Sequence, residues 1–319
     1  MKAAENITTL NYYPKRDPKR RVFALWYFTT LLIIWNILGY SVLGFEQAWI
    51  HPIAGVVTAI LMQFLLECVD AWANKRALRF LGGVEPVISF LPPAIIPGLA
   101  CAMLIYPNTR VSPVVFAAGA SIASKVIFRA PVGGGRTQHI FNPSNLGIVA
   151  TLLLFPWVGM APAYHFTENI TGPLNWVLPG IILISGIIIH SLFTGRLPLC
   201  LAWIGGFLAQ GLIRGLLLSS SWFVPLMPMT SAAFIIFTLY MIPDPATTPL
   251  KVKRQVAFGL AVAAIYGVLQ VLHIVYGLFI ALILVSAIRG ICLHIYGVFT
   301  LGWVTRERYA QKGVVASGD

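Results

Sequence analysis

Long apolar stretches alternate with short polar loops along the whole of this chain of 319 residues. We expect each stretch to form a membrane helix, because a bilayer core is crossed by roughly 20 apolar residues in helical form. The ten predicted segments cover about residues 22–44, 52–72, 87–106, 111–129, 143–157, 176–194, 197–218, 226–242, 255–273 and 276–300. Pro92, Pro93 and Pro97 interrupt the third, and such irregular backbone persists at membrane depth only where protein or a cavity covers it.

The composition supports a polytopic all-α membrane protein. Hydrophobic residues make up 58% of the chain and charged residues 10%, whereas a soluble domain carries about 25% charged residues. The first 21 residues are polar and basic and lack the apolar core of a cleavable signal peptide. The expected organisation is a basic tail (1–21), a first membrane repeat (22–157), an outer loop (158–175), a second repeat (176–303) and a second tail (304–319).

The basic residues are distributed unevenly about the predicted segments. Alternating ten segments places nineteen of the 22 lysines and arginines on one side, with Arg110 and Arg214 on the other and Arg289 inside the last segment. The positive-inside rule then predicts that both termini are cytoplasmic, in a multi-pass protein of a bacterial inner (plasma) membrane. The net charge of +12 is therefore explained by membrane orientation, and we expect a lipid bilayer rather than nucleic acid as partner.

A glycine-rich stretch followed by a helix-start signal lies between the fourth and fifth segments. Gly133, Gly134 and Gly135 allow a sharp turn beside Arg136. Asn142 is a preferred N-cap and Pro143 is favoured at the first helical position, so a helix should run from Pro143 to Leu154. Its free N–H groups, the helix dipole and Arg136 together predict an anion site.

A similar signal occurs about a hundred residues later. Asp244 precedes Pro245, and Thr247 and Thr248 follow. Two such breaks in two hydrophobic halves indicate a protein built from repeats, with a binding site where the broken segments meet. We therefore expect the chain around Asn142 and Asp244 to come together. The alternative is that both are ordinary helix-start loops, because Asn-Pro and Asp-Pro are common turn signals.

These motifs resemble the NqrB/RnfD family, the flavin-carrying membrane subunits of sodium-pumping NADH:quinone oxidoreductase and of the Rnf ferredoxin:NAD complex. The resemblance rests on the run from Gly133 to Pro156, with its Phe-Asn-Pro and closing Phe155-Pro156, and on Asp244-Pro245-Ala246-Thr247-Thr248-Pro249-Leu250. It covers roughly residues 85–160 and 225–270, and the rest by topology. It implies ten helices in two five-helix inverted repeats, with FMN or riboflavin bound between them.

The chain departs from the family pattern at two motifs. The Ser-Gly-Ala-Thr motif that carries covalent FMN in the outer loop is replaced by residues 168–173, where Thr171, or Thr167, would be the attachment site. A Gly-Glu-Thr-Ser stretch is replaced by residues 196–200. The compact chain is most similar to the stand-alone UnbU-like branch found beside enediyne biosynthesis enzymes.

Two main functions are compatible with this sequence. The first is a flavin-binding electron-transfer subunit that works with other membrane subunits and can be coupled to ion movement; it would be at most a redox subunit of a larger oxidoreductase. The second is a transporter or export component on the same fold, using alternating access. A scaffold subunit of a membrane complex is a third alternative.

Polar residues inside predicted segments supply further candidates. Gln63, Glu67 and Asp70 share one helix face and could hold a cation or pass a proton. The alternative is that the two carboxylates pair with Lys75 or Arg76 at the membrane interface.

Metal and haem chemistry receive little support from the sequence. His190, His273 and His294 show no pairing geometry for haem, so we do not expect it. The four cysteines lie in apolar segments without metal-binding spacing.

Overall fold

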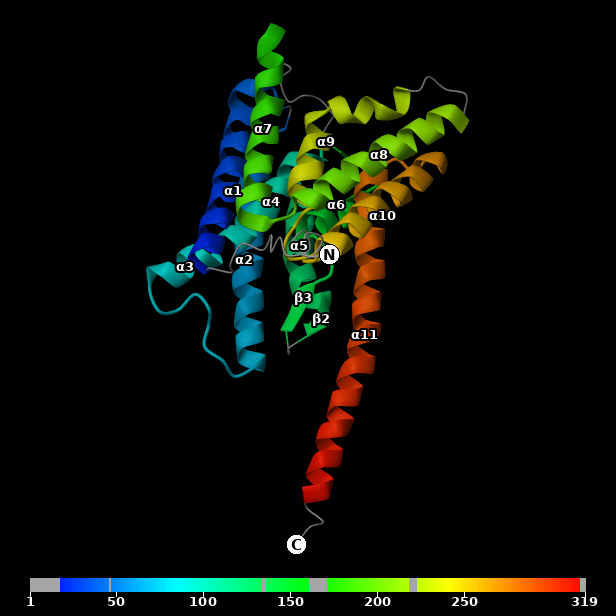
Figure 1. Cartoon of the computed structure of the whole chain (residues 1–319). Helices are drawn as coiled ribbons and strands as arrows, with labels where there is room; N and C mark the ends of the chain where they lie inside the picture. The colour runs from blue at the N-terminus through cyan, green and yellow to red at the C-terminus, as the bar shows by residue number, and fades with distance from the viewer. Residues whose placement is uncertain (1–17, 46, 134–135, 161–170, 218–222, 316–319) are drawn as a thin grey trace.

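The computed structural model describes residues 18–45, 47–133, 136–160, 171–217 and 223–315. Figure 1 shows a bundle of helices from which one long C-terminal helix projects. The first half of the chain forms α1 (Pro18–Leu38), η1 (Gly39–Leu43), α2 (Ile50–Ala73), α3 (Val84–Phe90), α4 (Pro92–Leu104), α5 (Ser112–Ile127) and α6 (Pro143–Leu154). The second half forms η2 (Gly172–Trp176), α7 (Val177–Ile188), η3 (Ile189–Thr194), α8 (Leu197–Leu217), η4 (Val224–Thr230), α9 (Ala232–Ile236), η5 (Phe237–Met241), α10 (Val252–Val271) and α11 (Gly277–Val315).

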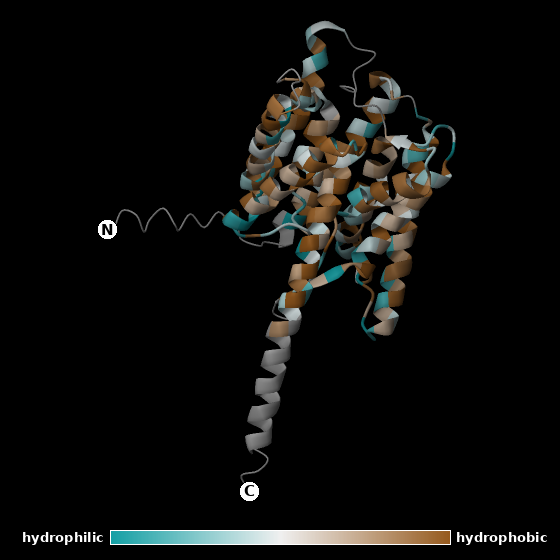
Figure 2. Cartoon of the chain, turned by 90° about the vertical axis from the view of Figure 1, so that its right-hand side faces the viewer, coloured by the Kyte–Doolittle hydropathy of each residue, from teal (hydrophilic) through white to brown (hydrophobic). Residues whose placement is uncertain are grey.

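Each of the ten predicted apolar segments coincides with a helix or with a run of two or three consecutive helices. Seven helical stretches are long and apolar enough to cross a membrane, and an eighth is added if the bent pair Val224–Thr230 and Ala233–Met241 counts as one span. The helices α5 and α6 are apolar but shorter. Figure 2 shows hydrophobic residues along the sides of the helices and hydrophilic residues near their ends and in the loops. The structure thus confirms a multi-pass membrane protein, with seven or eight long spans.

The two halves of the chain share two local features. In each, the first long helix ends in a π-helical turn followed by a left-handed glycine, Gly44 (φ 91°) after η1 and Gly195 (φ 63°) after η3. A seven-residue motif follows the third helical segment of each half, at 107–113 and at 243–249. It consists of proline, Asn or Asp, three variable residues, Ser or Thr, and a second proline. The halves are therefore alike in their helix ends and loop motifs as well as in their hydropathy.

Close helix crossings depend on glycine. A Cβ atom on Gly55 of α2 would lie 2.6 Å from the carbonyl oxygen of Gly98 in α4, and one on Gly259 of α10 would lie 2.6 Å from the carbonyl oxygen of Leu199 in α8. No side chain fits at these positions, which lets the two backbones approach as they do in packed membrane helices. Each half thus contains at least one tight helix pair.

The core of the second half is an aromatic cluster. Trp203 is fully buried, and its indole N–H donates to Thr238 Oγ1 (2.9 Å). Its ring centroid lies 5.5 Å from that of Phe207 and 5.8 Å from that of Phe237. Buried aromatic rings contribute much of the packing energy of a core, so α8, η5 and their neighbours form a rigid unit behind the loop that follows η5.

The fold also contains two small antiparallel sheets of two strands each. The strands β1 (Ile105–Tyr106) and β4 (Gly159–Met160) pair at one end of the bundle, and β2 (Arg129–Gly133) and β3 (Arg136–His139) form a hairpin at the other. The hairpin packs against α11, where Cβ atoms on Gly290 and Gly297 would collide with Ile140 and Pro131. Gly133 therefore lies at the far end of a hairpin that these two glycines of α11 accommodate.

Candidate functional site

The start of α6 has the capping geometry that the sequence predicts. Asn142 has an extended backbone, and its Oδ1 accepts hydrogen bonds from the Asn145 amide (3.1 Å) and from Ser144 Oγ (2.9 Å). Pro143 occupies the first helical position, and the helix ends at Leu154. The predicted helix is confirmed, but its own cap occupies one of the amide donors that we assigned to an anion.

The two sequence motifs come together, as predicted. The Asn142 side chain, almost entirely buried, donates from Nδ2 to the carbonyl oxygen of Met241 (3.1 Å). Gln138, on the hairpin, donates from Nε2 to the carbonyl oxygen of Pro245 (3.4 Å). Residues about a hundred positions apart therefore form one junction between the two halves of the chain.

Asp244 caps a single turn rather than a long helix. Its Oδ1 accepts from the Ala246 amide (2.9 Å), its Oδ2 from Thr247 Oγ1 (3.2 Å), and its carbonyl oxygen from Thr248 Oγ1 (2.6 Å). The next helix, α10, begins only at Val252. The expectation that both motifs are helix starts is therefore wrong for Asp244, because Pro249 disfavours the helical conformation at the residue before it and stops the turn.

Two arginines from other parts of the chain hold this loop: Arg196 lies between η3 and α8, and Arg289 lies in α11. Arg196, 2% exposed, donates from Nε to Thr248 Oγ1 (2.9 Å) and from NH2 to the carbonyl oxygen of Pro245 (3.4 Å). Arg289 of α11 donates from NH1 to the carbonyl oxygen of Thr247 (2.8 Å). We call Arg196, Arg289 and the loop 244–248 the loop clamp. Neither arginine was predicted to belong to the site, although an arginine inside an apolar segment, as Arg289 is, is itself a signal of function.

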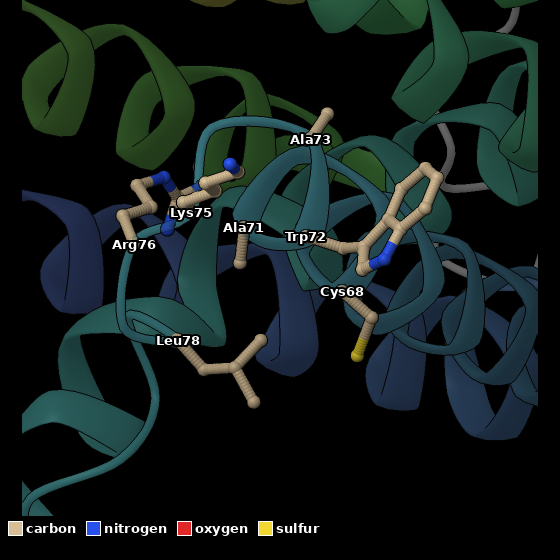
Figure 3. A pocket seen from close by; sticks show the side chains of 7 residues that line it. All are labelled: Cys68, Ala71, Trp72, Ala73, Lys75, Arg76 and Leu78. Atoms are coloured by element: carbon tan, nitrogen blue, oxygen red, sulfur yellow. The ribbon is translucent and has the colours of Figure 1, made fainter.

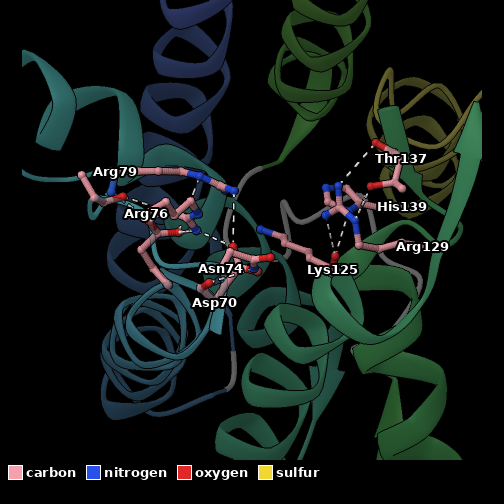
Figure 4. A network of polar contacts seen from close by, with 10 residues as sticks. Asp70, Asn74, Arg76, Arg79, Lys125, Arg129, Thr137 and His139 are labelled. Atoms are coloured by element: carbon pink, nitrogen blue, oxygen red, sulfur yellow. Dashed lines mark hydrogen bonds and ion pairs between the residues drawn. The ribbon is translucent and has the colours of Figure 1, made fainter. Parts of the chain in front are cut away.

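Lys125 lies close to the loop clamp and supplies a hydrogen bond that α4 lacks. Pro97, inside α4, has no N–H, so the carbonyl group of Pro93 one turn earlier lacks its usual helical partner. The ammonium group of Lys125 donates to this carbonyl oxygen. Figure 4 shows Lys125 extending between the two groups of polar side chains at this end of the bundle. The proline break predicted in the third segment is thus covered by a lysine from α5.

Positive charge exceeds negative charge around the loop. Lys125 and Arg289 form no ion pair with a described carboxylate, and the loop itself carries one acid, Asp244. Burial raises the pKa of Asp244 above its ordinary value, while the Ala246 amide, the Thr247 hydroxyl and the charges of Lys125 and Arg196 oppose that rise. Lys125, Arg196 and Arg289 lie around the loop of the half-buried Asp244, and this excess of cations favours an anionic ligand here.

The hairpin separates the glycine-rich stretch from the α6 cap. Gly133 pairs with Arg136 at the far end of the hairpin, whereas Arg129 pairs with His139 at its base, close to Asn142. Gly134 and Gly135 lie outside the described residues. The structure therefore does not bring Gly133 and Arg136 to the N-terminus of α6, because the intervening residues form a strand that leads away from it (Figure 1).

His139 lies at the base of the hairpin among cations. Its Nδ1–H donates to the carbonyl oxygen of Lys125 (3.1 Å). Burial, together with the positive charges of Lys125 and Arg129, lowers the pKa of His139 to about 4. The ring is therefore neutral at physiological pH and serves to tie the hairpin to the end of α5.

The carboxylates of α2 form an ion-pair network with arginines. This agrees with the alternative that they pair with basic residues at the membrane interface, rather than with a cation or proton site. Glu67 accepts from Arg76 NH1 (2.5 Å) and NH2 (2.9 Å), and Asp70 also pairs with Arg76. Arg79 lies 3.7 Å from Glu67 and 3.6 Å from Asp70. We call these four residues the acid cluster (Figure 4). Gln63 instead donates to the carbonyl oxygen of Phe90, so the predicted trio does not converge on one site.

The remaining candidates lie apart from the junction. Thr171 is exposed at the N-cap position of η2, and its side chain makes no capping bond; Thr167 lies outside the described residues. His190 is buried and hydrogen-bonded through both ring nitrogens, to Thr194 Oγ1 and to the Leu239 carbonyl. Within the described part of the chain, no group of three His, Cys, Asp or Glu side chains could hold a metal ion.

Comparison with known proteins adds no relative. No protein-family model matches this chain, and no curated protein matches it.

Proposed function

We propose that this protein is a flavin-binding membrane subunit that relays electrons across the bilayer within a larger complex. The observation that carries the proposal is the convergence of both sequence motifs on one junction, where Asn142 bonds to Met241 and Gln138 to Pro245. These are the motifs on which the resemblance to the NqrB/RnfD family rests, and their meeting is what a site between two repeats requires.

The donors of the loop clamp suit the phosphate of FMN better than uncharged riboflavin. Guanidinium groups bind phosphate through paired N–H donors, and Arg289 already uses two of them on neutral oxygens, those of Thr247 and Gln138. An FMN phosphate would exchange for these neutral acceptors, with Arg289 as its main partner and Lys125 as a nearby charge. When bound, a flavin accepts and passes on electrons.

We further propose ten crossings in two inverted repeats with cytoplasmic termini. The shared π-helical turns with Gly44 and Gly195, and the shared Pro-Asx loops at 107–113 and 243–249, support repetition between the halves. The uneven distribution of lysine and arginine supports the orientation. In this arrangement the loop clamp lies toward the cytoplasmic side of a bacterial plasma membrane.

The test is the visible absorption spectrum of the purified protein, before and after reduction. We expect flavin bands in the unmodified protein and loss of most of the flavin in Arg289→Gln. The control is Arg214→Gln, an arginine of α8 that donates to Gln210 of the same helix and has no described contact with the loop clamp. A colourless protein after reconstitution with FMN, or equal retention in both variants, would reject the proposal.

Non-covalent binding is the mode we propose. The attachment motif is lost around Thr171, and residues 158–175 contain no lysine or arginine to accompany a phosphodiester. In-gel fluorescence after denaturation separates the alternatives: we expect no fluorescent band. A band that disappears in Thr171→Val would instead establish covalent attachment there, and a band that persists in that variant would point to another residue.

A transporter on the same fold is the second candidate, and the broken spans favour it. The pair Val224–Thr230 and Ala233–Met241 is bent by 77°, and Pro97 lies inside α4. Transporters build their substrate sites from such discontinuous helices. A protein that stays colourless but takes up an anionic solute into vesicles, with loss of uptake in Arg289→Gln, would establish this function.

A further inference from the structure

A second region, distinct from the loop clamp, has the chemistry of a ligand site. An open pocket of about 880 Å³ surrounds the last turn of α2, and its lining is Cys68, Ala71, Trp72, Ala73, Lys75, Arg76 and Leu78. Figure 3 shows Lys75 and Arg76 side by side, with Trp72 and Cys68 across the helix end from them. We propose that this pocket binds the phosphate headgroup of an anionic phospholipid, whose acyl chains lie along α2.

The charge balance of the pocket leaves one cation available. Between Glu67 and Arg79 the chain carries two carboxylates and three cations. Arg76 and Arg79 are engaged by both carboxylates. Lys75 is exposed, and its ammonium group has no bonding partner among the described residues. The uncompensated positive charge therefore belongs to Lys75, with Arg76 behind it.

The backbone holds Lys75 in an unusual conformation. Its φ is +49°, in the left-handed region that glycine normally occupies after a helix. The Arg76 amide donates back to the carbonyl oxygen of Ala71 (3.0 Å), and the Lys75 amide to that of Trp72 (3.3 Å). Glycine or asparagine would suit this backbone conformation better, so a lysine here costs some stability. In return, the lysine places its ammonium group at the edge of the pocket.

An apolar track leads away from the pocket along α2. Large side chains at least half exposed recur on one face of the helix, at Ile53, Val57, Leu61, Leu65, Val69 and Trp72. Trp72 is 82% exposed at the end of the track, and an indole at the end of a membrane span is typical of the lipid–water interface. Acyl chains fit this track while a phosphate meets Lys75. The anionic headgroup, rather than a partner helix, is favoured because the track ends at an unpaired cation.

The test uses the full-length protein in phosphatidylcholine vesicles that contain a fixed fraction of brominated lipid. Bromine quenches nearby tryptophan fluorescence, and the Trp72 contribution is the difference between the unmodified protein and Trp72→Phe. We expect the Trp72 contribution to report about fivefold enrichment of brominated phosphatidylglycerol over brominated phosphatidylcholine, the preference that one basic residue confers near an anionic headgroup.

Lys75→Asn is the informative variant. Asparagine tolerates a left-handed backbone, so the helix end and the melting temperature should be kept or improved while the preference for phosphatidylglycerol disappears. Lys253→Asn, an exposed lysine of α10 outside the pocket, should keep the preference. Equal quenching by the two lipids in the unmodified protein, or a preference that survives Lys75→Asn, would overturn the proposal.

Two further outcomes identify other occupants. If both brominated lipids quench Trp72 only weakly, a protein partner covers the track and the lipid proposal fails. If millimolar inorganic phosphate abolishes the preference, the pocket holds a free anion rather than a lipid. We expect phosphate to have no effect, because the headgroup is retained by its acyl chains as well as by Lys75.

Discussion

The loop clamp and the acid cluster both place arginines beside a helix end, but their arginines have different acceptors. In the acid cluster, Arg76 bonds to the carboxylates of Glu67 and Asp70. In the loop clamp, the described bonds of Arg289 go to the backbone carbonyl of Thr247 and to the side-chain amide oxygen of Gln138. Carboxylates neutralise a guanidinium charge and neutral oxygens do not. The number of arginines is therefore less informative than the charge of their acceptors about where an anion can bind.

The largest expected effect is at the loop clamp. Arg196→Met removes donors from Thr248 and Pro245, and buried polar groups left unsatisfied cost about 1–3 kcal/mol each. We expect the free energy of unfolding in detergent to fall by about 3 kcal/mol. Arg254→Met, at an exposed position, should change it by less than about 0.5 kcal/mol. Similar losses in both variants would mean that the clamp is not a structural unit.

Acid should weaken the hairpin next to the loop clamp. The folded pKa of His139 is about 4, below the value of roughly 6.5 for an unfolded chain. The fold therefore favours the neutral ring, and this stabilisation is complete above roughly pH 6.5 and is lost as the pH falls toward 4, to a total of about 3 kcal/mol. Melting temperatures between pH 7 and 4 should show this loss, and His139→Gln should flatten it. An unchanged pH profile in His139→Gln would contradict the assignment.

The acid cluster should respond less to the loss of an arginine. Arg76→Gln deprives Glu67, whose side chain is 4% exposed, of its bidentate partner, yet the Arg79 amide still donates to Glu67 Oε1 (2.8 Å). We expect a lower melting temperature that a second substitution, Glu67→Gln, largely restores, because the charge left unpaired is then removed. Additive losses in the double variant would show that the two residues do not act as a pair.

The smallest effect concerns the bond between the two halves. Asn142→Ser keeps a capping oxygen but cannot reach Met241, so it should cost about 1 kcal/mol. Asn142→Ala loses the cap as well and should cost about 2 kcal/mol. Chemical unfolding of the three proteins separates the cap from the contact with Met241. Equal stability of Asn142→Ser and the unmodified protein would assign the whole role of Asn142 to the cap.

Local signals in the sequence predict the helices and the α6 cap well. Hydropathy alone places ten apolar helical segments, and the Asn-Pro pair fixes the start of α6 at Pro143. Both depend on neighbouring residues: a run of apolar side chains, a side-chain acceptor and a proline with no N–H to satisfy. The approach of the chain around Asn142 to the chain around Asp244 was also predictable, because broken segments of membrane proteins built from repeats meet at a binding site.

The arginine contacts and the hairpin could not be predicted in this way. Arg196 and Arg289 bond to carbonyls of a loop about 50 and 40 residues away, and every residue has a carbonyl, so no sequence pattern marks the acceptor. The strands beside Gly133 are only five and four residues long and include Pro131. Their pairing depends on the space that Gly290 and Gly297 leave on α11, which becomes visible only once the fold is known.

The bond between Lys125 and Pro93 constrains the order in which the protein can be assembled. The helix α5 has 16 residues and a lysine in its last turn, and α6 has 12 residues, about 18 Å of helix at 1.5 Å per residue. A hydrocarbon core of about 30 Å does not accept either helix alone, and α4 by itself would present an unbonded carbonyl to lipid. We therefore expect these three helices to enter the bilayer together during synthesis, because the ammonium group of Lys125 can then bond to the carbonyl oxygen of Pro93 as they insert.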